Sequence, residues 1–303
     1  MWTIELDDAQ RHDIASHATD AVLRECLIDE LTVSDVPFPT LAPVVERIRT
    51  ALDAHGFVLL RDFPVDLLTE REVEIAYVGL GLHLGTPVGQ DAHANVLGHV
   101  RDERQARTGP HIRLYQTHER QDFHTDGGDL VGLLCLRAAH SGGESRIASA
   151  HAVYNEVLRT RRDLLEVLYE PFAWDRNDEQ AEGDPPFFLL PAITDVGDVP
   201  RIFFIAWYVR DAQRHPDAPR LTDAQLDAIA LVERTANDPA FHLEMDFRPG
   251  DVQLLANDRI LHAREAFDDG PDPATRRHLL RLWLRRDDVR VNDLLRDGIP
   301  ARG

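Results

Sequence analysis

The feature of this sequence that most constrains its fold is a series of short apolar segments, separated by turns, that follows a helical N-terminal region. Each segment is too short for a typical globular helix and has the length of a strand. Many short strands predict a β-sandwich or barrel, in a fold that is mainly β with flanking helices (α+β). The clearest segments are FVLLRDF (57–63), LVGLLCL (130–136), FHLEMDF (241–247), VQLLAND (252–258) and RRHLLRLWLRR (276–286).

Helical patterns precede and interrupt these segments. Apolar residues at helical spacing occupy 41–52, and Gly56 is suited to end that helix. Residues 151–169 have the same spacing. A capping box at Thr222–Gln225 predicts the start of another helix, which extends to about Thr235.

The domain organisation follows from the same patterns, because no internal repeat, low-complexity tract or long linker interrupts the chain. The segment 201–209, RIFFIAWYV, is predicted as a further strand. We expect a single domain over residues 1–303. It would consist of a helical region at 1–54 and a β core at about 55–285, with a helical and loop insertion near 150–240.

Composition excludes several classes of protein. The formal net charge of −20 disfavours partners such as nucleic acid or an anionic membrane surface. All 33 basic residues are Arg, which excludes Schiff-base chemistry and the phosphate-binding lysine of a P-loop. The two cysteines lie far apart, the N-terminus resembles no signal peptide, and the apolar runs are much shorter than the roughly 20 residues of a membrane helix. We expect a cytoplasmic location.

Histidines two residues from an acid are candidate metal ligands, but the spacing alone is weak evidence. With 15 His and 53 acidic residues, about two or three such pairs are expected by chance. Asp217 follows a proline in a polar loop, which is typical of a turn. His242, Glu244 and Asp246 share one face of a predicted strand, and a solvated face explains them as well as a chelate does. The three pairs are His124/Asp126, His215/Asp217 and His242/Glu244.

The pair His124/Asp126 has a more informative context, since it stands directly before an apolar segment. In extended backbone, residues i and i+2 point the same way. Gly127 and Gly128 permit a close approach of backbone beside them. An iron(II) centre of two histidines and one carboxylate needs one further His. His262, in NDRILHAREAF, is the candidate, although alone it would be interpreted as a hydrogen-bonded surface histidine.

A strand predicted after His262 supplies a possible anion-binding group. Alternation places Arg277, Leu279, Arg281 and Trp283 on one face of this strand. Arginine grips a carboxylate as a bidentate fork, whereas outer ion pairs are the other explanation for two arginines on one face. Two histidines, an acid and a carboxylate-binding arginine are the groups that a 2-oxoglutarate-dependent oxygenase needs.

Five motifs in order, HTDGGD, SGGES, FRPGDVQLLAND, LHAR and RRHLLRLWLR, resemble those of the taurine dioxygenase-like (clavaminate synthase-like) iron(II)/2-oxoglutarate oxygenases. GFVLLRDFP at 56–64 is similar to an early strand of that family, and the likeness spans about residues 55–285. The resemblance implies a double-stranded β-helix core, which is a jelly-roll (cupin-like) fold. Such a fold agrees with the many short strands.

The resemblance also implies a cofactor and a co-substrate. His124, Asp126 and His262 would bind Fe(II). Arg277 would bind the distal carboxylate of 2-oxoglutarate, and Ser145, which stands where relatives frequently have Thr, would donate a hydrogen bond to it.

Other positions are less determined by the resemblance. Arg281 matches a second arginine that binds an anionic substrate group in some members. Asn257 and Asp258 have no assigned role, because Asp258 stands where relatives often have a second Asn. Related halogenases have a small residue at the carboxylate position, so Asp126 favours hydroxylation.

The expected reaction consumes O2 and 2-oxoglutarate, releases succinate and CO2, and hydroxylates an unactivated C–H bond of a small molecule. Desaturation, epoxidation and cyclisation stay open. The rival hypotheses are a zinc-dependent hydrolase with the same ligands and a non-catalytic jelly-roll small-molecule-binding protein. The sequence also leaves the oligomeric state open, including a homo-oligomer.

Two charge patterns bear on the substrate. The loop 174–186, WDRNDEQAEGDPP, carries five acids against one Arg and lies where relatives often have a lid. It would favour an amine-bearing substrate if it covered the pocket, whereas a solvated acidic loop is the commoner explanation. Arg281 and the arginines before the metal motif would suit a carboxylate, so an amino acid or related zwitterion satisfies both patterns. Those arginines are Arg101, Arg104, Arg107 and Arg113.

Overall fold

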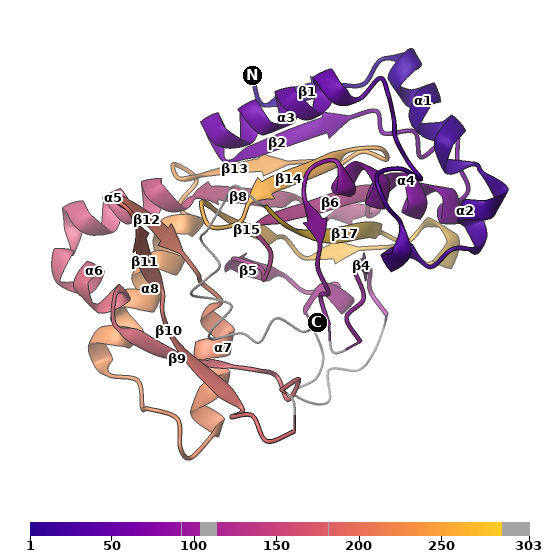
Figure 1. The fold of residues 1–303 in the computed structure, drawn as a ribbon. Coiled ribbons are helices and arrows are strands. Elements are labelled where there is room, and N and C mark those ends of the chain that lie inside the picture. Colours follow the sequence, from indigo (N-terminus) through magenta and orange to yellow (C-terminus); the bar gives the residue numbers. More distant parts are fainter. Residues whose placement is uncertain (92, 104–113, 181, 287–303) are drawn as a thin grey trace.

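Two β-sheets lie face to face at the centre of the molecule, and helices cover the outer face of each (Figure 1). The computed structural model describes the chain except residues 92, 104–113, 181 and 287–303. This arrangement of two sheets with flanking helices is that of a jelly-roll core, as predicted. Within the described residues, no helix is long and apolar enough to cross a membrane.

The major sheet has seven strands, and neighbours in it are mostly remote in sequence. β1 and β2 are parallel, and every other pair is antiparallel. The order is β1 (Thr3–Glu5), β2 (Phe57–Arg61), β14 (Val252–Ala256), β6 (Leu130–Arg137), β17 (His278–Arg285) and β3 (Thr86–Pro87), with β4 (Leu97–Val100) also paired to β17.

The minor sheet has four antiparallel strands and packs against the major sheet. Its order is β13 (His242–Met245), β8 (Ser145–Ser149), β15 (Ile260–Arg264) and β5 (Gln121–His124). A cluster of apolar side chains from both sheets fills one part of the space between them, and includes Phe57, Val131, Leu255, Ile147 and Ile260. A short ladder joins β7 (Ser141–Gly142) to β16 (Phe267–Asp268) beside this sandwich.

The N-terminal helices cover the outer face of the major sheet and share one apolar core with it. The helix predicted around residues 41–52 is present, and Gly56 ends it in the left-handed conformation with φ 81°. The helices are α1 (Asp8–Ala18), α2 (Ala21–Glu25), the 3-10 turn η1 (Ile28–Glu30), α3 (Ala42–His55) and α4 (Glu70–Leu82).

Residues 150–237 form a second group of elements that covers the outer face of the minor sheet. The capping box at Thr222 is confirmed, since its side chain and that of Gln225 exchange hydrogen bonds with each other's backbone. The elements are α5 (Ala150–Thr160), α6 (Arg162–Leu168), β9 (Pro171–Asp175), β10 (Phe187–Pro191), β11 (Ile193–Val196), β12 (Val199–Ile202), α7 (Ala206–Asp211), η3 (Ala212–Arg214) and α8 (Asp223–Asn237).

The strand predicted over 201–209 is present only at its first two residues and is wrong for 203–209. The strand ends at Ile202, and α7 begins at Ala206. The whole run is apolar and mostly buried, so its sequence contains no period that separates strand from helix. The backbone of Phe204 instead bonds to Thr125, where Thr125 N–H donates to the Phe204 carbonyl at 2.8 Å.

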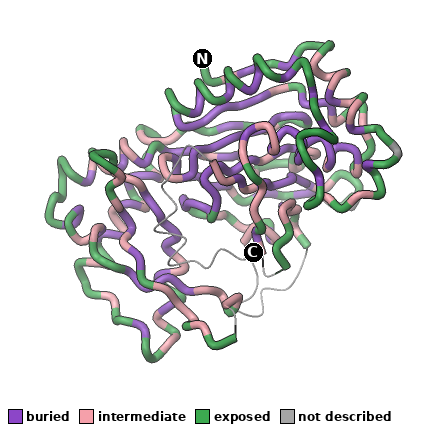
Figure 2. Tube along the Cα trace, viewed as in Figure 1, coloured by how far each residue is buried: buried purple, intermediate pink, exposed green. Residues whose placement is uncertain are grey.

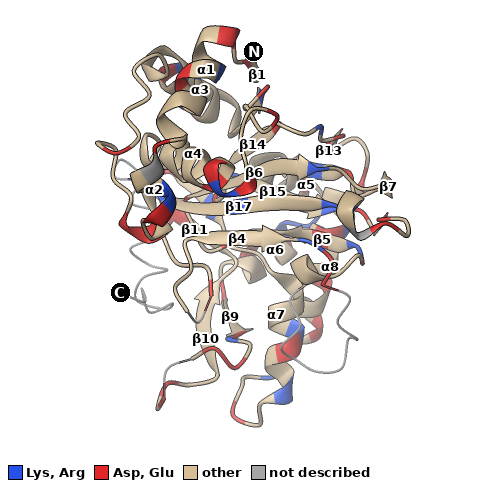
Figure 3. Cartoon of the chain, turned by 90° about the vertical axis from the view of Figure 1, so that its right-hand side faces the viewer, with Lys and Arg blue, Asp and Glu red and all other residues tan. Residues whose placement is uncertain are grey.

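Alternation along β17 divides its side chains between two environments. Leu280, Leu282 and Leu284 pack toward α4, whereas Leu279 and Arg281 point into the space between the sheets. Burial follows this plan, because the central strands β2, β14, β15 and β17 are almost continuously buried, whereas most helices are buried along one side (Figure 2). Charged residues lie mainly on helices, loops and strand ends (Figure 3). Charged side chains between the sheets are therefore exceptions.

Candidate active site

The three predicted metal ligands meet between the two sheets. His124 is the last residue of β5, and Asp126 follows it by two positions. His262 lies on β15, which pairs with β5 so that His262 and His124 are direct cross-strand partners. Residues more than 130 positions apart thus reach one point because their strands are neighbours. We call His124, Asp126 and His262 the inner triad.

The inner triad is buried and compact. Asp126 Oδ2 lies 3.5 Å from His262 Nε2, and Asp126 Oδ1 lies 3.9 Å from His124 Nε2. The ligand atoms of all three lie within 4.8 Å of one another. Ligands bonded to one metal at roughly 2.1 Å are about 3 Å apart. The donor set and spacing therefore fit a metal ion, and two imidazoles with one carboxylate are typical of non-haem iron(II).

The protonation of the inner triad also suits a cation. Burial and the neighbouring His262 lower the pKa of His124 to about 3, so its ring is neutral at pH 7 and keeps a lone pair. Burial opposes ionisation of Asp126, but the positive charge of Arg281 and the hydrogen bond with His262 outweigh it. They hold the pKa of that carboxyl well below its usual range. The site thus offers the neutral imidazole of His124 and the anion of Asp126, with the His262 ring beside them.

Hydrogen bonds orient the two ligands of the loop after β5. His124 Nδ1 lies 2.8 Å from the Asp122 carbonyl, which fixes the proton on Nδ1 and leaves a lone pair on Nε2, which lies 3.1 Å from Gln121 Nε2. Trp283 Nε1 donates to Asp126 Oδ2 at 3.0 Å. Trp207, at the start of α7, lies with its ring centroid 5.0 Å from that of His124. His124 and Asp126 are thus held in place by the protein itself.

The backbone around Asp126 is braced by Asn257, which had no role in the sequence interpretation. The Asn257 side chain accepts from Asp126 N–H at 2.8 Å and donates to the carbonyls of Asp126 and Gly128. A Cβ at Gly127 would lie 2.9 Å from the Trp283 ring, and one at Gly128 would lie 3.0 Å from Trp283 Cβ. The two glycines therefore permit the close approach that the sequence predicted. Asp258 points elsewhere and pairs with Arg201.

A cleft extends from the inner triad between the sheets, with about 450 Å³ of space that includes its opening to solvent. Arg277 and Ser145 lie in its wall, as the resemblance implied, and both are buried. Within the described residues, Arg277 Nη1 has no hydrogen-bond partner. Ser145 Oγ donates to Gln253 Oε1 at 3.1 Å. The described lining residues are Val100, Tyr115, Gln121, His124, Asp126, Leu133, Ser145, Phe247, His262, Ala263, Arg264, Arg277, Leu279 and Arg281.

Arg281 also faces this cleft and is fixed by its neighbours. Its guanidinium carbon lies 4.7 Å from the ring centroids of both Tyr115 and Trp283. Its Nε donates to Gln90 Oε1 at 2.7 Å, and its Nη1 lies 3.6 Å from Asp126 Oδ1. A rigid guanidinium next to the metal ligands can bind an anionic group there.

The rival histidine pairs do not form comparable sites. His242 Nδ1 bonds to the Ala236 carbonyl, and Glu244 is exposed and paired with Arg146. His215 Nε2 contacts the buried Asp175 at 2.9 Å rather than Asp217. These side chains act as structural partners.

Only some of the charged residues that could indicate the substrate lie within the described part of the chain. Asp175 and Asp178 of the acidic loop are paired with Arg214, and the described cleft lining contains no residue of that loop. Arg101 is exposed. Arg104, Arg107 and Arg113 lie outside the described residues.

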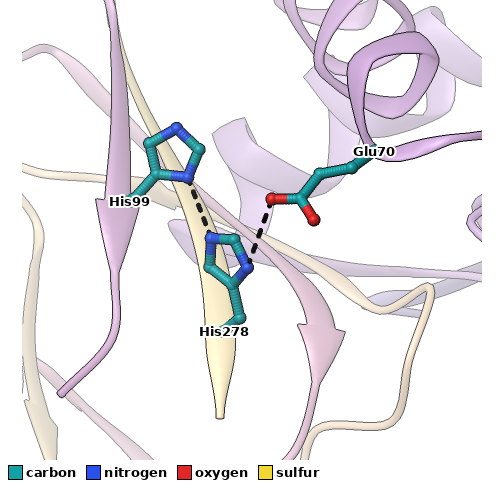
Figure 4. Close-up of side chains that lie close together, drawn as sticks. All are labelled: Glu70, His99 and His278. Carbon is teal, nitrogen blue, oxygen red and sulfur yellow. Dashed lines mark hydrogen bonds and ion pairs between the residues drawn. The ribbon is translucent and has the colours of Figure 1, made fainter. Parts of the chain in front are cut away.

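A second group of two histidines and a carboxylate lies on the opposite face of the major sheet. Glu70 of α4, His99 of β4 and His278 of β17 have ligand atoms within 4.8 Å of one another (Figure 4). His99 Nδ1 and His278 Nε2 are 2.9 Å apart. No sequence pattern pointed to this group, because its members come from three separate elements. We call it the outer triad.

Comparison with known proteins identifies the family. The family described as "Taurine catabolism dioxygenase TauD, TfdA family" matches residues 26–283, which is most of the chain. The chain belongs to this family. It is therefore an iron(II)/2-oxoglutarate-dependent oxygenase, and the zinc hydrolase and the inert binding protein are not favoured.

Relatives and solved structures agree with this assignment. FR-33289 synthase from Streptomyces rubellomurinus (strain ATCC 31215) is 32% identical over 96% of this chain and 87% of its own length. A uridine-5'-phosphate dioxygenase from Amycolatopsis sp is 29% identical over 76% of this chain and 85% of its own. An asparagine oxygenase complex with Fe(II), 3-hydroxyasparagine and succinate has a TM-score of 0.71 at 16% identity and 94% coverage of both chains. The oxygenase OrfP, in complex with Fe and alpha-ketoglutaric acid, has a TM-score of 0.68 at 16% identity, again with 94% coverage of both chains.

Sequence reasoning missed three side chains in or beside the cleft. Trp283 was placed on the correct face, but its hydrogen bond to Asp126 was not foreseen. Arg264 lies two residues after His262, so the alternation used for His124 and Asp126 would have found it. Trp207 was assigned to a strand and to the core, and only the turn into α7 brings it to His124.

Proposed function

We propose that His124, Asp126 and His262 bind the iron(II) of this oxygenase. The observation that supports the proposal is the convergence of two buried imidazoles and one ionised carboxylate, each oriented by a further hydrogen bond or cross-strand contact. Iron(II) bound there, with 2-oxoglutarate and O2, supplies the chemistry that releases succinate and CO2 and oxidises a substrate C–H bond. The protein positions the reactants and excludes bulk water, because the triad lies between the two sheets.

We infer that Arg277 and Ser145 hold the distal carboxylate of 2-oxoglutarate. Arg277 is buried in the wall of the cleft, and its Nη1 is a donor without a partner among the described residues. Such a donor is costly unless a ligand accepts from it. Ser145 can contribute its hydroxyl proton once that proton turns away from Gln253.

The substrate that this cleft favours is a small molecule with an anionic group, hydroxylated at an unactivated C–H bond. Arg281, clamped between Tyr115 and Trp283 beside the metal ligands, is the group that would anchor the anion. Amino acids are the first class to test, since the asparagine oxygenase and OrfP complexes contain hydroxylated amino acids. The acidic loop no longer supports an amine, because Asp175 and Asp178 pair with Arg214 and the described cleft lining contains no residue of the loop.

The proposal is tested by adding Fe(II) and 2-oxoglutarate to the anaerobic protein and recording the visible charge-transfer band. We expect a band from the wild type and none from Asp126→Ala at the same concentrations. Absence of the band from well-folded wild type, at saturating iron, would contradict the assigned ligands. Substrate-dependent succinate release across amino acids and other small anionic compounds then identifies the substrate class.

A further inference from the structure

The end of the cleft that contains Ser145 has two arginines rather than one. Arg264 is the last residue of β15, and its direct cross-strand partner on β8 is Ser145. It is 6% exposed, and Arg277 is 4% exposed. Both guanidinium carbons lie over the ring of Phe267, at 4.9 Å and 5.1 Å from its centroid. A single aromatic ring therefore supports two buried cations.

Arg264 has donors that its protein contacts do not use. Its Nη2 donates to the carbonyls of Glu119 and Leu114. Within the described part of the chain, its Nε and Nη1 have no hydrogen-bond partner, nor does Nη1 of Arg277. Buried guanidinium donors without acceptors are unfavourable, so this end of the cleft is built for an anion.

The acids near the two arginines leave these donors unused. Arg264 and Arg277 are both guanidinium cations at pH 7. The buried Asp269 acts on both arginines. Asp102 also acts on Arg264 but already contacts His118 at 3.1 Å. Neither acid accepts a hydrogen bond from Arg264 Nε, Arg264 Nη1 or Arg277 Nη1 in the described structure, so these donors are available to a carboxylate.

The distance from the inner triad fits the same ligand. His262 and Arg264 are two residues apart on β15, which corresponds to roughly 7 Å along a strand. A five-carbon 2-oxo diacid that reaches the metal with its keto-acid end places its other carboxylate near this position. A shorter ligand would not reach both ends.

We propose that Arg264 is a second guanidinium for the distal carboxylate of 2-oxoglutarate, so that Arg264 and Arg277 clamp it from two strands. This inference rests on the proposed function, which assigns Arg277 and Ser145 to the same carboxylate. Gly143 makes room for the clamp, because a Cβ there would lie 3.2 Å from both Arg277 Nε and Phe267 Cβ.

The test compares two ligands in the full-length protein with anaerobic Fe(II). 2-Oxoglutarate and 2-oxopentanoate share the keto-acid end and the chain length, but only the first has the distal carboxylate. Binding is measured by the charge-transfer band or by calorimetry. Arg264→Gln is expected to weaken the affinity for 2-oxoglutarate by about 10- to 100-fold. It should change the affinity for 2-oxopentanoate by less than about twofold.

Control variants make the result specific. Arg146→Gln removes a guanidinium from the opposite face of β8, where it pairs with Glu244 and Glu265, and should leave both affinities unchanged. Arg264→Lys, which keeps the charge without the fork, should give an intermediate loss and serves as the test if the Gln variant does not fold. Equal losses for the two ligands, or no loss for 2-oxoglutarate, would overturn the clamp. A wild type that does not bind 2-oxoglutarate would instead overturn the proposed function.

Discussion

The inner and outer triads contain the same kinds of side chains, yet their surroundings differ in every respect that matters for a cation. They lie on opposite faces of the major sheet, and β17 runs between them: Arg281 points into the cleft, whereas His278 points toward α4. The members of the inner triad are all buried. In the outer triad only His278 is buried, and the Glu70 side chain is half-exposed.

Hydrogen bonding separates the two triads most clearly. Arg137 Nη2 lies 3.0 Å from His278 Nδ1, and a guanidinium can only donate. The single proton of a neutral His278 must therefore be on Nε2, where it bridges to His99 Nδ1. Both ring nitrogens of His278 are used, one of them by a cationic guanidinium. His124 donates through Nδ1, and its Nε2 faces the other two members of the inner triad with only the neutral Gln121 amide beside it, at 3.1 Å from Gln121 Nε2. A metal site needs lone pairs that converge, and residue types near one another are not sufficient.

The largest expected effect comes from removing one ligand of each triad. Losing a residue that only hydrogen-bonds to a metal ligand lowers metal affinity by about 10- to 100-fold. His262→Ala removes a proposed ligand itself, so it should lower the affinity for Fe(II) by more than about 100-fold. His99→Ala should leave iron affinity unchanged, because its Nδ1 bonds to His278 rather than to a free site. Anaerobic Fe(II) titration measures both. A comparable loss from His99→Ala would place the iron in the outer triad.

A smaller effect is expected from the indole that orients the inner carboxylate. Trp283→Phe keeps a ring beside Arg281 but removes the donor to Asp126 Oδ2. Iron affinity should fall by about tenfold or more, and the charge-transfer band should shift. Trp174→Phe is the matched control, since it removes a buried indole bond to the Leu190 carbonyl far from the cleft. Identical iron affinities of the two variants would contradict the positioning role of Trp283.

The outer triad should instead influence stability in acid. Burial, followed by His99, Arg137 and Arg101, lowers the pKa of His278 from 6.5 to about 3. As pH falls below about 6.5, the unfolded chain takes up a proton that the folded one does not, so stability present above that pH is lost toward pH 3.

Urea unfolding of His278→Gln at pH 7 and pH 5 checks this linkage. Between these values the wild type should lose about 2 kcal/mol through His278 alone. The variant should lose that much less, although His124, with a similarly lowered pKa, still contributes in both proteins. Equal losses of stability between pH 7 and pH 5 in the wild type and in His278→Gln would show that His278 is not the source of this pH dependence.

The smallest effect is expected at the half-exposed acid of the outer triad. Glu70 Oε1 lies 3.7 Å from His278 Nδ1, and Glu70 begins α4. Glu70→Gln should change the free energy of unfolding by about 1 kcal/mol or less, through the helix dipole, because His278 is neutral at pH 7 and forms no ion pair with Glu70. Iron affinity should not change. A large loss of stability in thermal or urea unfolding would mean that Glu70 is a stronger partner of His278 than its exposure suggests.

The predictions made from sequence were most accurate where a local pattern, such as side-chain alternation along a strand or a helix-capping motif, determined the geometry. Alternation correctly placed Arg277 and Arg281 on the cleft face of β17, and the capping box and Gly56 correctly located helix ends. The three members of the inner triad were found from motif order. Their contact depends on the pairing of β5 with β15, which no local pattern in the sequence specifies.

The missed features have a different physical origin. The run 201–209 is mostly apolar and mostly buried, so no contrast between faces revealed its turn into α7. Gln90 and Tyr115 hold Arg281 from segments with no recognisable pattern. The hydrogen bond that excludes the outer triad as a metal site comes from Arg137 on a neighbouring strand. Each of these depends on long-range packing, which a single sequence does not encode locally.

The side chains of β17 alternate between the cleft and α4, so the strand cannot gain or lose a residue without exchanging the two sets. Deleting one residue near its start would invert every later side chain, directing arginine and tryptophan toward α4 and leucines into the cleft. Loss of turnover and collapse of the helix packing would then appear together. Insertions and deletions should therefore be much rarer within this strand than in the loops on either side of it, even though substitutions on one face can be made without disturbing the other.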